Sequence, residues 1–315
     1  MTRFLARRLA FAAFLVFAVS SASLVLARLA EGDYVSGTLG VEARRETTEQ
    51  LRARYGLDKP IAAQYADWLR RAVRFDFGTS LLYDRPVREL VPERAVNTAI
   101  LALAALALAT LIGVPLGIIA GSRNGLLSAS IRSTSIVFLS LPPLLTSLLL
   151  VFMAARTGWF PIAGIRSAAV PPGGKAIDLL HHLVVPACAL ALPLAAVFER
   201  LQAQAMGEVI AEPFITAALA RGVGWRRIVW RDGLKPALRP VAAIYGLAIG
   251  TLLSGSFAVE VITSWPGLGN LMLQALRARD VYLVAGCAGA GALFLAVGTL
   301  VSDVALAVVD PRARE

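Results

Sequence analysis

Six long apolar segments with almost no charged residues restrict the possible folds of this chain more than any other feature. A helix needs about 20 mainly apolar residues to cross a bilayer. The composition agrees, because 57% of the residues are hydrophobic and only 17% are charged, against about 25% charged residues in soluble domains. The sequence therefore predicts an all-α polytopic membrane protein with six transmembrane helices. The six segments are Leu9–Ala27, Ala95–Ala120, Ile131–Ala155, Leu183–Leu201, Val241–Ile262 and Val281–Val309.

The first segment has two interpretations. Arg3, Arg7 and Arg8 precede its apolar run and SSAS lies within it, as in a secretory signal peptide. Its apolar core of 19 residues is longer than the usual core of about 7 to 15 residues. We therefore expect an uncleaved membrane anchor.

The distribution of Lys and Arg predicts the orientation. With both termini inside, the inner segments hold 14 of the 31 Lys and Arg residues, and the short outer loops 156–182 and 263–280 hold five. Short cytoplasmic loops are enriched in these residues, so we expect cytoplasmic N- and C-termini. The predicted regions are a helix in residues 1–30, an extracytoplasmic loop in residues 31–94 and a five-helix domain in residues 95–310. That domain would include a cytoplasmic loop at 206–236 and an extracytoplasmic loop at 263–280.

Glycine and proline recur inside the predicted spans. Gly113, Gly117 and Gly121 are spaced by four residues, as are Gly246 and Gly250. This spacing lets helix backbones approach closely in lipid. Prolines also interrupt the predicted helices and predict kinks, either in a static bundle or in one that changes shape. They are Pro115, Pro142, Pro143, Pro186 and Pro193.

Charged residues in the spans are few and lie near the ends. Glu199 and Arg200 are near an inner end, Glu260 is near an outer end, and Asp303 is in the last span. A carrier driven by an ion gradient usually has ionisable groups near the membrane midplane. A secondary carrier therefore fits poorly, and we do not expect the energy source to lie in this chain.

Motifs for catalysis or metal binding are not evident. His181 and His182 are adjacent and point to different helix faces, so they do not form a two-histidine metal site. Cys188 and Cys287 lie in apolar runs, and Gly174-Lys175 lacks the other residues of a phosphate-binding loop. An intramembrane protease would need a Ser/His or Asp pair in facing helices, and no such pair is evident in the sequence. We therefore expect no enzyme activity, no cofactor and no metal in this chain.

A basic segment between two apolar spans, Phe214–Pro240, contains six Lys or Arg residues and one acid. Glu212-Pro213 predicts a helix start, and Gly222 predicts its end. Phe214, Ala217, Ala218 and Arg221 recur on one helix face. Gly224 opens a second basic segment, Trp225–Lys235. The pattern indicates two short helices broken by a glycine turn, or a basic helix lying on anionic lipid.

At these residues the sequence resembles a known family. TAALARG (Thr216–Gly222) and DGLKPALRP (Asp232–Pro240) are similar to the two halves of the coupling motif in membrane subunits of ATP-binding-cassette importers, in the dipeptide, oligopeptide and nickel branch. That motif has the form T-A-x-A-x-G, then about nine residues, then H-A-L-R-N-A-L-x-P.

The resemblance covers nearly the whole chain. The matching elements are LARRLAFAAFLVF, YGLDKPIAAQYADWLRRAVRFDFGTSL (Tyr55–Leu81), RPV, IGVPLGIIAG, LSLPPLL, GWFPIAG, EVITSWPGLG (Glu260–Gly269), Arg279-Asp280 and Asp310-Pro311-Arg312. The departures are Asp232 for a histidine, Gly233 for an alanine, Pro236 for an asparagine, Thr263 for an aromatic residue and a different start of the second span at Asn97.

The resemblance implies the type I importer transmembrane fold and a set of partners. We expect a second homologous permease subunit in a heterodimer, two cytoplasmic ATP-binding subunits that hold ATP and Mg, and an extracytoplasmic substrate-binding protein. The location would be the bacterial plasma (inner) membrane, in the lipid bilayer, with no nucleic acid bound. The family imports short peptides, nickel or other small solutes, and we favour peptides. Export would leave the outer loop's likeness to binding-protein-dependent importers unexplained.

The resemblance also implies two sets of site residues. We hypothesise that Glu208–Arg221 is the coupling helix that contacts an ATPase. The coupling residues would be Glu208, Pro213, Thr216, Ala217, Ala218, Arg221, Gly222, Arg226, Arg227, Arg231 and Asp232. The substrate path or outer gate would include Glu260, Trp265, Pro266, Gly267, Gln274, Arg279 and Asp280.

The outer segment after Pro266-Gly267 predicts a short amphipathic helix with Leu268, Leu271, Met272, Ala275 and Leu276 on one face. Trp265 and Gln274 would meet the substrate or a docked binding protein. The alternative is a re-entrant helix that is packed only for stability. The loop Tyr55–Leu81 would fold over the outer mouth as small helices, close enough for Asp76 or Asp84 to cross-link to a binding protein.

Overall fold

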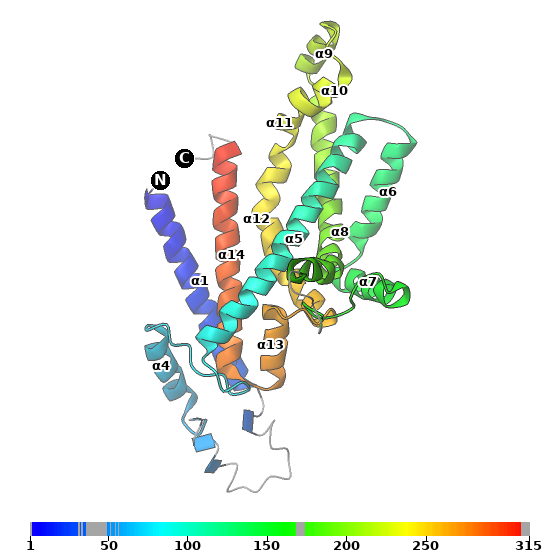
Figure 1. Ribbon diagram of the computed structural model, residues 1–315. Coiled ribbons are helices and arrows are strands. Elements are labelled where there is room, and N and C mark those ends of the chain that lie inside the picture. Colours follow the sequence, from blue (N-terminus) through cyan, green and yellow to red (C-terminus); the bar gives the residue numbers. More distant parts are fainter. Residues whose placement is uncertain are drawn as a thin grey trace. The chain divides into compact units, whose positions relative to one another are not determined.

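The computed structural model describes residues 2–30, 32, 34–35, 49–50, 52–53, 55, 57–167 and 174–309. The predicted all-α fold is confirmed, since the described residues contain helices, turns and an isolated bridge between Thr79 and Pro86, but no β-strand. The longer helices in Figure 1 are α1 (Thr2–Leu29), α4 (Ile61–Ala72), α5 (Val87–Ser122), α6 (Leu126–Ser140), α7 (Pro143–Thr157), α8 (Lys175–Ile210), α9 (Pro213–Ala220), α12 (Arg239–Ile262), α13 (Leu268–Arg277) and α14 (Val281–Val309).

Most of the predicted spans are each contained in one helix of the described chain. Four helices are long and apolar enough to cross a membrane, and two further bent helix pairs bring the number to six if each pair is one span. The predicted span Ile131–Ala155 is not a single helix. It is divided between α6 and α7, whose axes differ by 104°, so the kink predicted from Pro142 and Pro143 is present as a sharp bend.

The break between α6 and α7 follows from two consecutive prolines. Leu141 has an extended backbone (φ −95°, ψ 116°) and so has Pro142 (φ −60°, ψ 148°). A residue before proline avoids the helical region, and neither proline has an N–H to donate. Pro143 then takes the first position of α7, where a missing N–H is tolerated. By contrast, Pro186 and Pro193 lie inside α8 without ending it.

The chain divides into two compact units, which are described separately. The first unit comprises Met1–Ala99 and Pro266–Val297. One cluster in it joins the start of α5, α13 and α14, through Leu90, Leu271 and Leu283 among others. A second cluster brings Leu24 of α1 and Trp68 of α4 against Ala285 of α14.

The second unit comprises Ile100–Trp265 and Gly298–Glu315, and α8 is its central helix. A Cβ atom on Gly113, Gly117 or Gly121 of α5 would approach the α8 backbone to between 2.3 and 2.6 Å, which is closer than real Cβ contacts. Only glycine permits this approach, as the spacing predicts. The main core of the unit packs Leu101 of α5, Phe198 of α8 and Val259 of α12.

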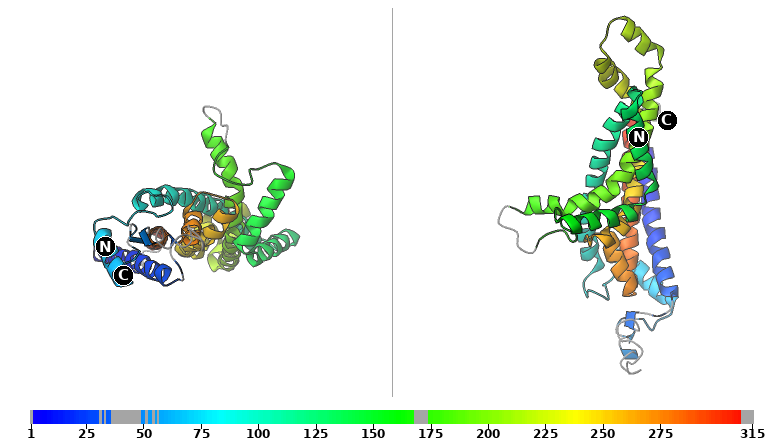
Figure 2. Two further views of the ribbon diagram at one scale, coloured as in Figure 1. Left: turned by 90° about the horizontal axis from the view of Figure 1, so that it is seen from below. Right: turned by 90° about the vertical axis from the view of Figure 1, so that its right-hand side faces the viewer.

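Helix α8 is longer than the membrane requires. Its 36 residues span about 54 Å at 1.5 Å per residue, against a hydrocarbon core of about 30 Å. Beyond its end the chain forms α9, α10 (Trp225–Arg227), the π-helix η1 (Ile228–Gly233) and α11 (Leu234–Ala237). These four helices are called the inner module below. Figures 1 and 2 show α9 and α10 beyond the end of α8, as a hooked projection of this unit.

Candidate functional site

The inner module begins where α8 stops. Glu208 lies in the last turn of α8, Ala211 and Glu212 form a turn, and Pro213 occupies the first position of α9. The predicted helix start at Glu212-Pro213 is therefore confirmed. A continuous helix over Glu208–Arg221 is wrong, because Pro213 has no N–H to extend α8 and its fixed φ starts a new helix instead.

Gly222 ends α9 in a Schellman motif, as the sequence predicts. Its φ is +78°, in the left-handed region that favours glycine. The Gly222 N–H donates to the Leu219 carbonyl (2.9 Å), and the Val223 N–H donates to the Ala218 carbonyl (3.1 Å). These two bonds define the motif. Val223 also packs on the buried cluster of Ile215, Ala218 and Ile228, so the turn fixes α9 against η1.

The buried face of α9 is not the face that carries Phe214, Ala217 and Arg221. Ile215 and Ala218 are buried, whereas Phe214, Ala217 and Arg221 are exposed. The spacing predicted the helix correctly, and the contact with Ile228 of η1 determines that Ile215 and Ala218 form its buried face. The exposed residues of the predicted coupling set are Glu208, Pro213, Thr216, Ala217, Arg221, Gly222, Arg226, Arg227, Arg231 and Asp232.

A π-helix lies in the second basic segment, which the sequence predicted only as a short helix. It includes two of the positions at which the chain departs from the family motif, Asp232 and Gly233. Asp232 is exposed, whereas Gly233 is buried, and a Cβ atom there would be 3.3 Å from the Ile228 carbonyl and 3.5 Å from Met206 Cε. The tight contact is therefore with the backbone of η1 itself, whereas the distance to Met206 of α8 is an ordinary van der Waals contact. π-Helical turns are rare and often occur at functional sites.

The inner module is anchored to the spans by apolar contacts. Val229 of η1 and Ala237 of α11 pack with Met206 of α8 and Ile118 of α5. The part of the chain that carries the exposed arginines is therefore packed directly against two helices long enough to cross a membrane. A force applied to the inner module would be passed directly to α5 and α8.

The predicted outer-gate residues fall in both units. In the second unit, Glu260 and Trp265 are fully buried, and the Trp265 N–H donates to the Glu260 carbonyl (2.8 Å). Trp265 belongs to the main core of that unit. In this conformation its ring therefore presents no surface to a substrate or to a docked protein.

In the first unit, Pro266 and Gly267 form the turn that leads into α13. The Asn97 side chain donates to the Pro266 carbonyl (2.8 Å), and the Leu268 N–H donates to the Thr98 hydroxyl (2.8 Å). Gln274 is exposed on α13 and accepts a hydrogen bond from the Tyr83 hydroxyl. Trp265 and Gln274 were both predicted to meet a substrate or a binding protein, and of these two only Gln274 is exposed.

Asp280 is a structural centre of the first unit. It is fully buried, and its carboxylate accepts hydrogen bonds from the Ser80 hydroxyl (2.6 Å), the Leu82 N–H (3.1 Å) and the Leu283 N–H (3.1 Å). The last of these caps the start of α14. Arg279 beside it is exposed, with φ +57°. The carboxylate thus ties the segment after α4 to α14.

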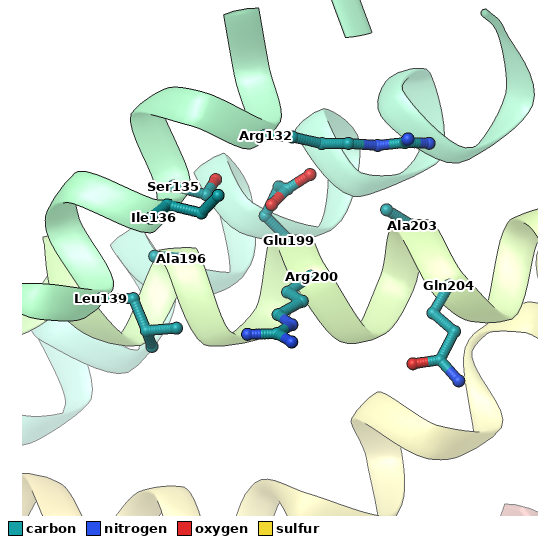
Figure 3. A pocket seen from close by; sticks show the side chains of 9 residues that line it. All are labelled: Arg132, Ser135, Ile136, Leu139, Ala196, Glu199, Arg200, Ala203 and Gln204. Carbon is teal, nitrogen blue, oxygen red and sulfur yellow. The ribbon is translucent and has the colours of Figure 1, made fainter. Parts of the chain in front are cut away.

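A cavity with both polar and apolar lining residues, which the sequence did not predict, lies between α6 and α8 of the second unit. It has a volume of about 440 Å³, and Glu199 lines it (Figure 3). The sequence placed Glu199 at an inner helix end, but its side chain is only 2% exposed. One sequence feature could have indicated this site. Glu199 lies three residues before Gln202, so the two polar side chains lie on the same face of α8.

The amino-acid sequence of the chain matches two models of a known protein family. Residues 113–315 match the family model for binding-protein-dependent transport system inner membrane components. Residues 1–83 match the model for the N-terminal part of membrane components of such transport systems. The chain belongs to the family of binding-protein-dependent transport system inner membrane components, and it is a multi-pass membrane permease subunit of the ATP-binding-cassette type.

Several curated proteins align with almost the full length of this chain. The oligopeptide transport system permease protein AppB of Bacillus subtilis is 32% identical over 315 residues, with 99% of each chain covered. A putative peptide permease protein of Brucella suis is 32% identical over 319 residues, covering 100% of this chain and 99% of the relative. The oligopeptide transport system permease protein OppB of Mycobacterium bovis is 33% identical over 332 residues, covering 100% of this chain and 99% of the relative.

Proposed function

We propose that this chain and a second, related permease subunit form the translocation path of an importer for short peptides. The relatives from Bacillus subtilis and Mycobacterium bovis are named as oligopeptide permeases, which favours peptides over nickel or another small solute. An extracytoplasmic binding protein would deliver the peptide from outside. The membrane would be the bacterial inner membrane.

The energy would come from two cytoplasmic partner subunits that bind ATP with Mg and hydrolyse it. The inner module is the observation that carries this proposal. It presents exposed arginines, among them Arg221 and Arg226, on a base packed against α5 and α8. Arginine forms strong, directional hydrogen bonds with carboxylates. An acidic cleft on an ATPase subunit would therefore hold the inner module, and closure of the two ATPases would move the spans.

Within this proposal, α9 and the glycine turn after it are the coupling element. The outer residues have different roles: Gln274 is accessible to a docked binding protein, whereas Trp265 and Asp280 stabilise the units that carry the path. Asp76 and Asp84 remain the positions at which we expect cross-links to the binding protein.

Two measurements test the proposal. The chain is purified with an affinity tag from its native membrane, and the proteins that accompany it are identified by mass spectrometry. We expect a second permease subunit and two ATPase subunits. The complex is then reconstituted with its binding protein, and peptide uptake is measured with and without ATP. Uptake that proceeds without the ATPase subunits would overturn the proposal.

A further inference from the structure

A carboxylate without a partner is buried in the middle of the second unit. Glu199 is 2% exposed, and its Oε1 atom has no hydrogen-bond partner in the described part of the chain. Gln202, on the same face, is fully buried, and neither polar atom of its amide has a partner there. Burial of an uncompensated charge is strongly unfavourable. Ionisable groups inside a membrane usually mark a path for a ligand.

Glu199 is among the lining residues of two cavities. The cavity of about 440 Å³ lies between α6 and α8, and a second, more apolar cavity of about 220 Å³ also involves α5. Glu199, Ser135 and Ala196 line both cavities. Small-molecule sites usually have volumes of about 300 to 1,000 Å³. The larger cavity is therefore large enough for one end of a short peptide.

A positive charge lies on the opposite wall of the larger cavity. In Figure 3 the Glu199 carboxylate projects toward α6, and the Arg132 side chain extends beyond it. Arg132 donates to the Ala120 carbonyl (2.9 Å), which holds its guanidinium in place. Neither Arg132 nor Arg200 forms an ion pair with Glu199 among the described residues. The cavity thus offers an acceptor for a cation on one wall and a donor for an anion or carbonyl on the other.

We propose that Glu199 is the amine-binding residue of the path, and that it holds the α-ammonium group of the peptide while Arg132 donates to the peptide's carbonyl or carboxylate oxygens. This inference rests on the proposed function, since it assumes that the ligand is a peptide. An ammonium group would supply the partner that Glu199 lacks, and the peptide end would fill the space beside it. The same chemistry, a primary ammonium group, is present in aminophospholipids.

The test uses the intact complex with its binding protein, in vesicles of phosphatidylcholine and phosphatidylglycerol, which contain no primary amine. Uptake is measured for a tripeptide and for its des-amino analogue, each normalised to the occupancy of the binding protein. We expect Glu199→Gln to lower uptake of the tripeptide at least tenfold and to leave uptake of the analogue unchanged. Glu199→Asp should retain the preference for the free amine.

A matched control is available on α5. Glu93 is exposed and lies 3.3 Å from Arg85, so Glu93→Gln removes one carboxylate without touching the cavity and should leave both uptake rates unchanged. If the Glu199→Gln complex does not assemble, Ser135→Lys places a competing ammonium group in the cavity while Glu199 stays in place. This second variant must also abolish the preference for the free amine.

Three outcomes would overturn the inference. The first is an equal loss of uptake for both substrates in Glu199→Gln, which would indicate a purely structural role. The second is an unchanged preference in Glu199→Gln or Ser135→Lys. The third is a Glu199 effect that appears only when phosphatidylethanolamine is added, which would identify a lipid as the ligand. Failure of the proposed function is distinct, because the unmodified complex would then take up neither substrate.

Discussion

Substitution of Gly222 tests the coupling element directly, since this residue ends α9 with φ +78°. No atom lies within 4 Å of the position that a Cβ would occupy, so a substitution acts on the backbone alone. Alanine in the left-handed region costs about 1–2 kcal/mol, which changes a conformational equilibrium about 5- to 30-fold. Asparagine tolerates this region better. We expect uptake to fall in the order Gly, Asn, Ala.

Proline is the most severe change at this position. Its ring fixes φ near −65°, and it removes the N–H that donates to the Leu219 carbonyl (2.9 Å). The Schellman motif then cannot form, and Val223 leaves the cluster of Ile215, Ala218 and Ile228. We expect Gly222→Pro to abolish ATP-stimulated uptake while the protein still inserts into the membrane.

The assay is ATP-dependent peptide uptake by the reconstituted complex, with membrane insertion checked by protease protection. Gly224→Ala is the matched control, because Gly224 has an ordinary backbone (φ −64°, ψ 139°) and open space around its Cβ position. It should transport normally. Normal uptake by Gly222→Pro would refute the assignment of α9 as the coupling element.

Three further substitutions test the packing of the two units by thermal unfolding in detergent. Gly117→Ala should lower stability by about 1–3 kcal/mol, because the new Cβ would lie 2.6 Å from Gln202 Cβ; Gly207→Ala on α8, whose nearest atom is at 3.9 Å, should not. Asp280→Ala should cost at least about 2 kcal/mol, since it leaves the buried donors of Ser80 and Leu283 without an acceptor; an unchanged melting temperature would contradict the structural role of Asp280. Trp265→Ala should cost about 3–5 kcal/mol, whereas Gln274→Ala should stay within about 0.5 kcal/mol; the reverse order would show that Trp265 is not a core residue.

The spans could be predicted from the sequence because apolar length alone specifies them. The segment Val281–Val309 coincides with α14, and Val241–Ile262 lies within α12. The close approach at the three glycines of α5 could also be predicted, because four-residue spacing places them on one helix face. The 104° bend at Leu141–Pro142 occurs where two successive prolines remove neighbouring donors, whereas Pro186 and Pro193 of α8 are seven residues apart and do not end the helix.

The details of the inner module depend on tertiary contacts that periodicity does not encode. Gly222 was predictable, since a helix end that needs a positive φ selects glycine. The buried face of α9 was not, because Ile228 of the following π-helix selects Ile215 and Ala218. Glu199 likewise read as an end-of-span charge, and only the packing of α6 against α8 shows that its carboxylate is buried beside a cavity.

We propose that this permease subunit moves peptides only when partner subunits hydrolyse ATP. The most direct measurement is the initial rate of peptide uptake into proteoliposomes that contain the complete complex and its binding protein. ATP, a non-hydrolysable analogue or no nucleotide is placed on the side of the inner module. We expect uptake only when ATP is present, at a rate that the removal of an ion gradient does not change. Uptake that follows an ion gradient and ignores ATP would contradict it.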